Sequence, residues 1–257
     1  MKANAKKAVD CSSRAGTLAA ETDGASGSEQ AKVVLEKHSR SRLPSTLEGS
    51  AALSYADIAF FFVFVFSLAM MFRIGVHLHA LSRTRLDNPT LPFQITISLS
   101  LIGSLYAIIR LRHGRGVWKL LGWSWPTRIH LVAALLGGIG LGIGVDIIAH
   151  ATTSTTHVIH FWNLILLDAL LGPIIEESLF RGCLLPVVSR TTGPTVGIAA
   201  TAVLFATLHP TSTFVQWLCF ASTGTAFGWI RVKSGSTAAS TLMHAVYNAT
   251  LFLCQGL

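Results

Sequence analysis

The amino-acid sequence predicts an all-α protein: a polytopic transmembrane helical bundle of about seven spans that follows a disordered N-terminal tail. Charged residues make up only 12% of the 257 positions, about half of the roughly 25% found in a soluble domain. Of the 20 Lys and Arg and the 12 Asp and Glu residues, 14 lie in the first 50 positions. Later stretches without any of these residues reach the length of about 20 apolar residues that crosses a bilayer. They are 88–109, 147–167, 191–230 and 234–257.

Residues 1–50 form the predicted tail, because they are rich in Ala, Ser, Gly, Lys and Glu and almost lack aromatic residues. Such a composition cannot bury a core and is typical of a disordered segment. The tail has no apolar region of the kind found in secretory signals, and its six acidic residues argue against an organellar transit peptide. Residues 51–257 form the predicted transmembrane domain.

Seven apolar segments of this domain are expected to be the membrane-spanning helices. A kink or tilt is expected in the fourth segment, because Gly172-Pro173 interrupts it. The fifth and sixth segments are separated only by 210–212, so their helices should be antiparallel neighbours. Trp118 and Trp123 precede the third segment, as is typical of the interfacial aromatic belt. The seven segments are about 53–72, 93–109, 129–149, 161–189, 195–209, 213–230 and 238–256.

Glycines recur in the third and sixth segments. No strand precedes them and they lie within apolar windows, so they do not indicate a phosphate-binding loop. Small residues four apart let helix backbones approach closely in lipid, and close helix packing is the interpretation we prefer. The glycines are Gly137, Gly138, Gly140, Gly142 and Gly144 in the third segment, and Gly224 and Gly228 in the sixth.

The distribution of basic residues predicts the orientation in the membrane. Lys and Arg concentrate in the second half of the tail, in the 110–128 loop, and at Arg231 with Lys233. Cytoplasmic loops carry an excess of these residues. We therefore expect an integral, multi-pass protein of a bacterial plasma membrane, with its N-terminus in the cytoplasm and its C-terminus outside.

Neither nucleic acid nor cysteine chemistry is indicated. The net charge of +8 resides in the tail and in short loops, and no nucleic-acid-reading motif accompanies it. The four cysteines lie far apart without CxxC spacing, so they predict neither a disulfide framework nor a cysteine metal site. They are Cys11, Cys183, Cys219 and Cys254.

Ionisable residues within the apolar segments are the candidates for function, because each costs at least ~2.5 kcal/mol at membrane depth and usually marks a working site. The fourth segment contains Glu176, Glu177 and Arg181. Glu177 and Arg181 are four positions apart with the acid first, which favours a structural ion pair. Adjacent helical residues point about 100° apart, so Glu176 lacks a partner on its own helix face. It must pair with another segment, bind something, or be protonated.

Two other segments offer partners for Glu176. Phe205 and His209 are four apart in the fifth segment, and His244 and Asn248 are four apart in the seventh. A carboxylate, two imidazoles and an amide supply a general base, proton-transfer groups and hydrogen-bond donors for an oxyanion. Each pair alone has a structural explanation, such as hydrogen bonding between helices, but their conjunction favours a site. Other polar residues share no such spacing and are interpreted as loop, interface or packing residues: Asp146, His150, His157, His160 and Asp168.

The order EExxxR, FxxxH and HxxxN on successive apolar helices resembles the CaaX-protease and bacteriocin-processing (CPBP, Abi) family of intramembrane proteases. Its best-known members are the type II CaaX prenyl endopeptidases. The resemblance covers roughly residues 120–256 and holds at every motif position. It implies that Glu176 and His209 activate a water molecule, and that His244 and Asn248 stabilise the tetrahedral oxyanion. It implies peptide-bond hydrolysis within a membrane cavity, without implying a prenylated substrate.

The leading hypothesis is therefore an intramembrane endopeptidase that acts on a peptide or membrane-protein substrate in the lipid bilayer. A catalytically idle bacteriocin-immunity or scaffold protein and a proton-coupled transporter are the alternatives. No cofactor is expected, because the HExxH motif is absent and a zinc-bound Glu176 would no longer be the general base. A zinc site with Glu176, His209 and His244 as ligands is the alternative to this metal-free mechanism.

Overall fold

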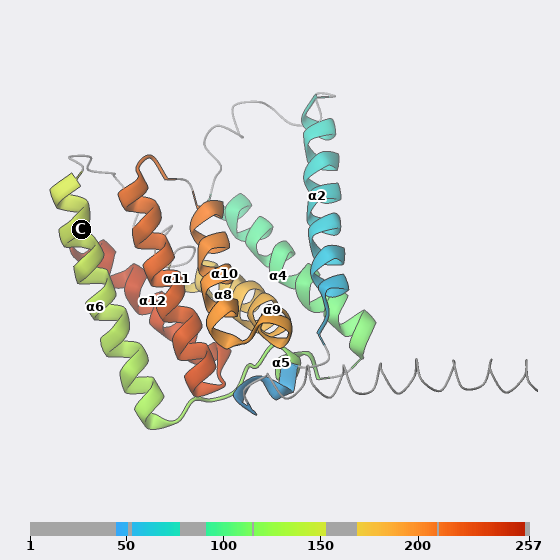
Figure 1. The fold of residues 1–257 in the computed structure, drawn as a ribbon. Helices are drawn as coiled ribbons and strands as arrows, with labels where there is room; N and C mark the ends of the chain where they lie inside the picture. Colours follow the sequence, from blue (N-terminus) through green and yellow to red (C-terminus); the bar gives the residue numbers. More distant parts are fainter. Residues whose placement is uncertain are drawn as a thin grey trace, which may run out of the picture. The chain divides into compact units, whose positions relative to one another are not determined.

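The computed structural model describes residues 45–50, 53–77, 91–114, 116–152, 169–209 and 211–254. The chain divides into two compact units, Met1–Arg42 and Leu43–Leu257, and all described residues lie in the second. Within the described ranges every regular element is a helix (Figure 1). The elements are η1 (Ser45–Ser50), α2 (Tyr55–His77), α4 (Leu91–His113), α5 (Val117–Leu120), α6 (Arg128–Thr152), α8 (Gly172–Glu177), η3 (Ser178–Leu184), α9 (Leu185–Thr192), α10 (Pro194–Leu208), α11 (Phe214–Ser234) and α12 (Thr237–Cys254).

Two of these helices are long and apolar enough to cross a membrane by their length and composition. The windows are Gln94–His113 of α4 and Arg128–Ile148 of α6, and only 11% and 17% of them are buried within the protein. The core helix of a soluble protein would be mostly covered by its neighbours. Large apolar side chains on α2, such as Phe64 and Phe66, are exposed as well. Lipid accommodates such surfaces, whereas water does not.

Helices occupy each of the seven predicted segments as far as the described ranges extend. The fourth segment corresponds to α8, η3 and α9, and its first residues, 161–168, lie outside the described part. Asp146 and His150 lie on α6, whereas His157, His160 and Asp168 are not among the described residues. That each segment crosses a membrane stays a prediction.

The end of the predicted tail is structured, which corrects its boundary. Residues Ser45–Ser50 form the 3₁₀-helix η1, in which Leu47 is fully buried. The Thr46 hydroxyl donates a hydrogen bond to the Val232 carbonyl at 2.7 Å. Leu47 supplies the apolar anchor that the composition of the tail as a whole lacks. Residues 1–44 lie outside the described part.

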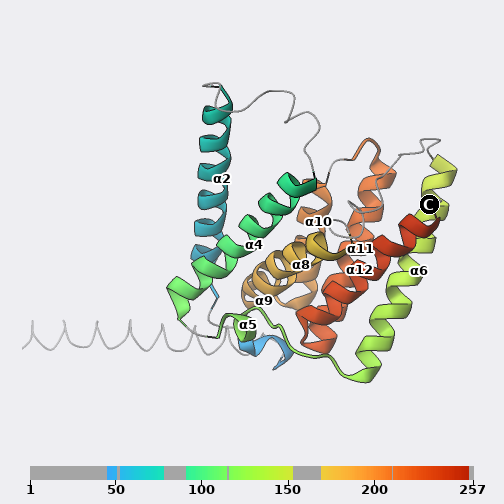
Figure 2. The same ribbon diagram turned by 180° about the vertical axis from the view of Figure 1, so that it is seen from behind.

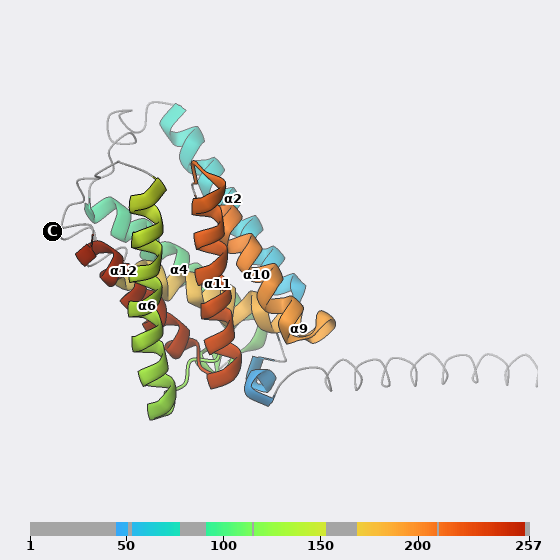
Figure 3. The same cartoon turned by 60° about the vertical axis from the view of Figure 1, so that its left-hand side comes forward.

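Glycines bring α6 and α12 into close contact, as the sequence predicts. A Cβ atom at Gly138 would lie 2.6 Å from the Met243 carbonyl oxygen, and one at Gly142 would lie 2.6 Å from Thr250 Cβ. Gly140 faces open space, because it lies on the other side of the helix. The contacts advance together along both helices, so α6 and α12 run in the same direction (Figure 3).

The antiparallel packing of α10 and α11 is also confirmed. A Cβ atom at Gly224 would touch Ala202, and one at Gly228 would touch Ile198. Residue numbers therefore increase along α11 while those of the contacted residues decrease along α10. After the short connection, α11 begins at a capping box. The Thr213 side chain accepts a hydrogen bond from the Gln216 backbone N–H, and the Gln216 side chain accepts one from the Thr213 backbone N–H.

The fourth segment departs from regular α-geometry on both sides of its Gly-Pro pair, because residues 169–171 and η3 are both π-helical. The backbone is helical at Leu171, with φ −70° and ψ −43°, and Pro173 lies in the first turn of α8, where its missing N–H costs little. The next seven residues, η3, form a π-helix. Such segments are rare and occur frequently at functional sites. Sequence periodicity did not indicate this one.

Candidate active site

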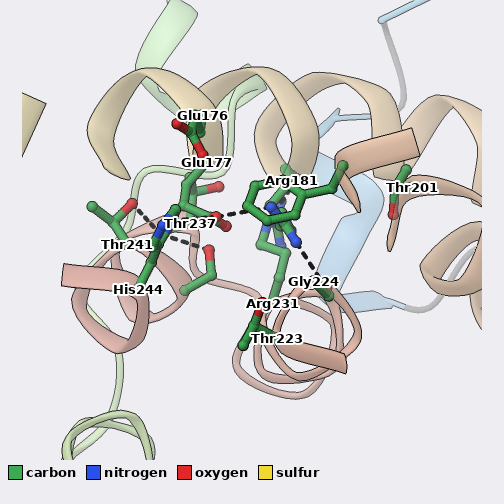
Figure 4. A network of polar contacts seen from close by, with 12 residues as sticks. Glu176, Glu177, Arg181, Thr201, Thr223, Gly224, Arg231, Thr237, Thr241 and His244 are labelled. Atoms are coloured by element: carbon green, nitrogen blue, oxygen red, sulfur yellow. Dashed lines mark hydrogen bonds and ion pairs between the residues drawn. The ribbon is translucent and has the colours of Figure 1, made fainter. Parts of the chain in front are cut away.

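The two adjacent glutamates lie where α8 meets the π-helix η3. Glu177 and Arg181 are both fully buried, and the Arg181 Nη1 donates to Glu177 Oε1 at 2.8 Å (Figure 4). The Arg181 Nη2 donates to the Gly224 carbonyl on α11, also at 2.8 Å. The ion pair within the helix is the one that the four-residue spacing favours, and the contact with Gly224 ties it to the next helix.

Aromatic rings enclose the Arg181 guanidinium. Its Cζ lies 4.8 Å from the ring centroid of Phe205, 5.4 Å from that of Phe227 and 5.6 Å from that of Phe180. Rings at these distances attract a cation through their negative faces. Phe205 also packs against His209, with ring centroids 4.3 Å apart. Phe205, the aromatic residue of the FxxxH motif, therefore contacts both the buried Arg181 and His209.

His244 is held against the same carboxylate. Its Nδ1 lies 3.1 Å from Glu177 Oε1, and its ring stacks on Phe227 at 4.6 Å and 20°. A carboxylate accepts here, so Nδ1 carries the proton and donates, which leaves Nε2 for another partner. The four-residue spacing in the sequence predicted only Arg181 as a partner of Glu177. The contact with His244 joins residues 67 positions apart, which no local pattern indicates.

Glu176 faces His209 instead. Its Oε2 lies 3.7 Å from His209 Nε2, and both side chains are partly exposed, at 32% and 23%. The His209 Nδ1 donates to the Phe205 carbonyl at 2.7 Å, which leaves Nε2 facing Glu176. The ring stacks on Phe220 at 4.4 Å. The two glutamates thus have different partners, as adjacent positions on a helix require.

Asn248 is half-buried one turn beyond His244 on α12, so the two residues share a helix face. Together α8, η3, α10 and α12 supply an imidazole–carboxylate pair that is partly exposed and a second imidazole that is buried. The burial of Arg231 was not predicted from the sequence. Arg231 was expected in a loop, but it is buried in α11 and donates from Nε to the Arg181 carbonyl at 3.2 Å.

The three residues of the alternative zinc set do not converge on one point. Over the described ranges, no three His, Cys, Asp or Glu side chains gather closely enough to hold a metal ion. Glu176 and His209 are neighbours, whereas His244 directs its Nδ1 to Glu177. This arrangement does not fit a preformed site of Glu176, His209 and His244, and no step below involves a metal.

Comparison with protein families tests the resemblance that the motifs indicate. Residues 158–250 match the family model described as type II CAAX prenyl endopeptidase Rce1-like. This segment is similar to the Rce1-like family. The match confirms the resemblance and includes all three motifs. No curated protein and no solved structure gives a significant match. The Rce1-like family is a family of proteases, and the match together with the exposed apolar helices favours a membrane protein.

Proposed function

We propose that this protein is an intramembrane endopeptidase in which Glu176 and His209 activate the water molecule that attacks a peptide carbonyl. The observation that supports it best is the 3.7 Å separation of Glu176 Oε2 and His209 Nε2. A water molecule at a hydrogen-bond distance of about 2.8 Å from each atom fits this separation, with one proton directed at each acceptor. Its lone pair is then available for the substrate.

The reaction needs one proton acceptor and one proton donor. Glu176 takes a proton from water as the oxygen attacks the carbonyl carbon, and the same proton passes to the leaving amine when the C–N bond breaks. Glu176 Oε2 is a buried atom without a hydrogen-bond partner among the described residues, so no protein donor occupies its lone pairs. The products are a carboxylic acid and an amine, and the enzyme returns to its starting state.

His244 and Asn248 are proposed to stabilise the tetrahedral oxyanion. The Glu177 carboxylate fixes the His244 ring through Nδ1, so the ring is oriented before substrate binds. A protonated Nε2 would donate directly to the oxyanion. Asn248, one turn away, would add its amide N–H.

The proposal extends to the membrane setting. All seven predicted segments cross the bilayer, the N-terminus lies in the cytoplasm of a bacterium, and the substrate is a membrane-associated peptide or protein. The partly exposed Glu176 and His209 are the groups that such a substrate would meet, whereas Glu177 and Arg181 are inaccessible.

The test is a comparison of peptides from cells that contain the wild-type protein or its Glu176→Gln variant. We expect peptides with new termini only with the wild type, at equal protein levels. Equal peptide sets, together with retained binding of a membrane partner, would favour the idle immunity or scaffold protein instead.

A further inference from the structure

A pocket that contains none of the candidate active-site residues is lined by parts of η1, α5 and α11. Figure 2 shows where α5 and α11 lie in the bundle. The volume of the pocket is about 360 Å³, within the range of roughly 300–1,000 Å³ typical of sites for small ligands. The walls come from η1, α5, the loop that precedes α6, and the end of α11. The lining residues are Thr46, Trp118, Lys119, Gly122, Trp123, Ser124, Arg231 and Gly235.

The charge of this pocket is positive. Its lining includes the basic side chains of Lys119 and Arg231 and no acidic side chain. Lys119 is exposed, and its ammonium group makes no hydrogen bond or ion pair with other described residues. The hydroxyl-bearing residues Thr46 and Ser124 add neutral polar groups. This composition suits an anion that bears several oxygen atoms.

The fold fixes the Arg231 guanidinium at the inner wall. Arg231 is only 1% exposed, and it donates to the backbone carbonyls of Arg181 and Thr46 at 3.2 and 3.5 Å. Gly122 makes room for it, because a Cβ atom there would overlap the guanidinium. Gly122 also has φ +69°, a conformation that favours glycine. The cation is therefore preorganised by backbone contacts.

The outer wall is aromatic. Trp118 and Trp123 meet edge to face with ring centroids 6.2 Å apart. The Trp123 Nε1 donates to the Ser178 hydroxyl at 3.3 Å, which anchors this wall to the π-helix. Tryptophan is enriched at the level of the lipid headgroups, where one edge of the ring is wet and the other is apolar.

Further basic residues lie at the ends of other helices of this unit. The last turn of α4 contains Arg110 and Arg112, of which Arg112 pairs with Asp57, and α6 begins at Arg128. Basic pockets between membrane helices at the side that carries the basic loops bind anionic lipid headgroups. The aromatic wall and the basic lining together thus favour a ligand that is an anion at one end and apolar at the other.

We propose that this pocket binds the phosphate group of an anionic phospholipid. Lys119 pairs with the phosphate oxygens, the buried charge of Arg231 adds attraction from the inner wall, and Trp118 and Trp123 contact the carbon atoms next to the phosphate. The inference does not depend on the proposed peptidase activity. Because Arg231 also holds the Arg181 carbonyl, the bound lipid would stabilise the helix that carries the two glutamates.

The test uses the purified full-length protein in detergent at 0.15 M salt, where long-range attraction between exposed charges is largely screened. Native mass spectrometry would follow the binding of phosphatidylglycerol and phosphatidylcholine, with inorganic phosphate as a competitor. We expect one phosphatidylglycerol molecule to bind in preference to phosphatidylcholine. Lys119→Gln should weaken this binding about fivefold, the usual effect of one basic residue at an anionic surface.

The matched control is Lys233→Gln, which removes the same charge from an exposed site on α11 outside the pocket lining. It should leave the affinity unchanged. Equal effects of the two variants, or no effect of Lys119→Gln, would overturn the proposal. Displacement of the lipid by an equal concentration of inorganic phosphate would also overturn it, because the pocket would then be a site for a soluble phosphate. Lys119 lies on the surface, so its variant folds even if Arg231 variants do not.

Discussion

Glu177 Oε1 accepts hydrogen bonds from two cationic or ionisable partners: it lies 2.8 Å from Arg181 Nη1 and 3.1 Å from His244 Nδ1. One buried carboxylate oxygen therefore joins the π-helix to α12. Glu176, the next residue in the chain, makes neither contact and faces His209. Mutations at the two positions are expected to have different consequences.

Glu176→Gln should leave the folded protein intact and abolish most of its activity. Glutamine keeps the size and the hydrogen-bonding reach of the side chain but cannot take a proton from water. Turnover per folded molecule is expected to fall at least ~100-fold, the usual scale for loss of a general base. The measurement is cleavage of a peptide found in the cell comparison, normalised to folded protein. Normal turnover would contradict the catalytic role.

Glu177→Ala should instead lower stability. The buried guanidinium of Arg181 loses its counterion and His244 loses its acceptor, and breaking a buried pair in this way costs about 3–5 kcal/mol. The yield of folded protein and its Tm should both fall. Glu177→Gln serves as the control, because its amide oxygen still accepts one hydrogen bond, and it should be intermediate. A stable Glu177→Ala protein would show that the pair contributes little.

Two glycines on α6 provide a matched pair for a test of helix packing. Gly138→Leu would place its side chain against the Met243 carbonyl and Val246 on α12, whereas Gly140→Leu would point into open space. Overpacking typically costs about 1–3 kcal/mol, so only Gly138→Leu should lower the Tm in detergent. Similar Tm values for the two variants would argue against the close contact of α6 with α12.

The proposed orientation can be measured by cysteine accessibility. Cysteines introduced at Leu35 and Arg115, in a background without the native cysteines, should resist impermeant reagents in intact cells. They should react after permeabilisation, which shows that the sites themselves are reactive. Labelling of both from outside would reverse the orientation.

A metal-free mechanism predicts that chelators do not affect activity. Purified active protein should not contain stoichiometric zinc. Its turnover should be unchanged after treatment with a chelator that is removed by dialysis before the assay. Stoichiometric zinc, with activity lost on chelation and restored by zinc, would favour Glu176, His209 and His244 as ligands.

The parts of the fold and the site that depend on local spacing were predictable from the sequence. The Glu177–Arg181 pair follows from a four-residue spacing, and the close packing of α6 against another helix follows from small residues four apart, although this spacing does not identify α12 as the partner. The contact between Glu177 and His244 depends on how α12 packs, which spacing within one helix does not encode.

Burial was the harder property to predict. Arg231 directly follows an apolar segment, so the sequence predicts a cation in a loop. In the structure α11 continues past Arg231 and ends before Gly235, which has φ +67°. The Arg181 carbonyl accepts a hydrogen bond from the buried Arg231 side chain. The structure of η1 depends on one leucine in a polar stretch, Leu47, whose burial needs surfaces that are distant in the sequence. Both features depend on tertiary contacts.

The shared direction of α6 and α12 constrains the number of membrane crossings. Two parallel membrane helices of one chain are separated by an odd number of crossings, and the three proposed spans between α6 and α12 meet this requirement. They are the fourth segment, α10 and α11. Thr46 lies beside the end of α11, where α12 starts, and Cys254 lies at the opposite end of α12. A chain that enters at one face of the membrane and leaves at the other traverses it an odd number of times. Reporters placed near these two residues should therefore report opposite compartments, whichever face is cytoplasmic.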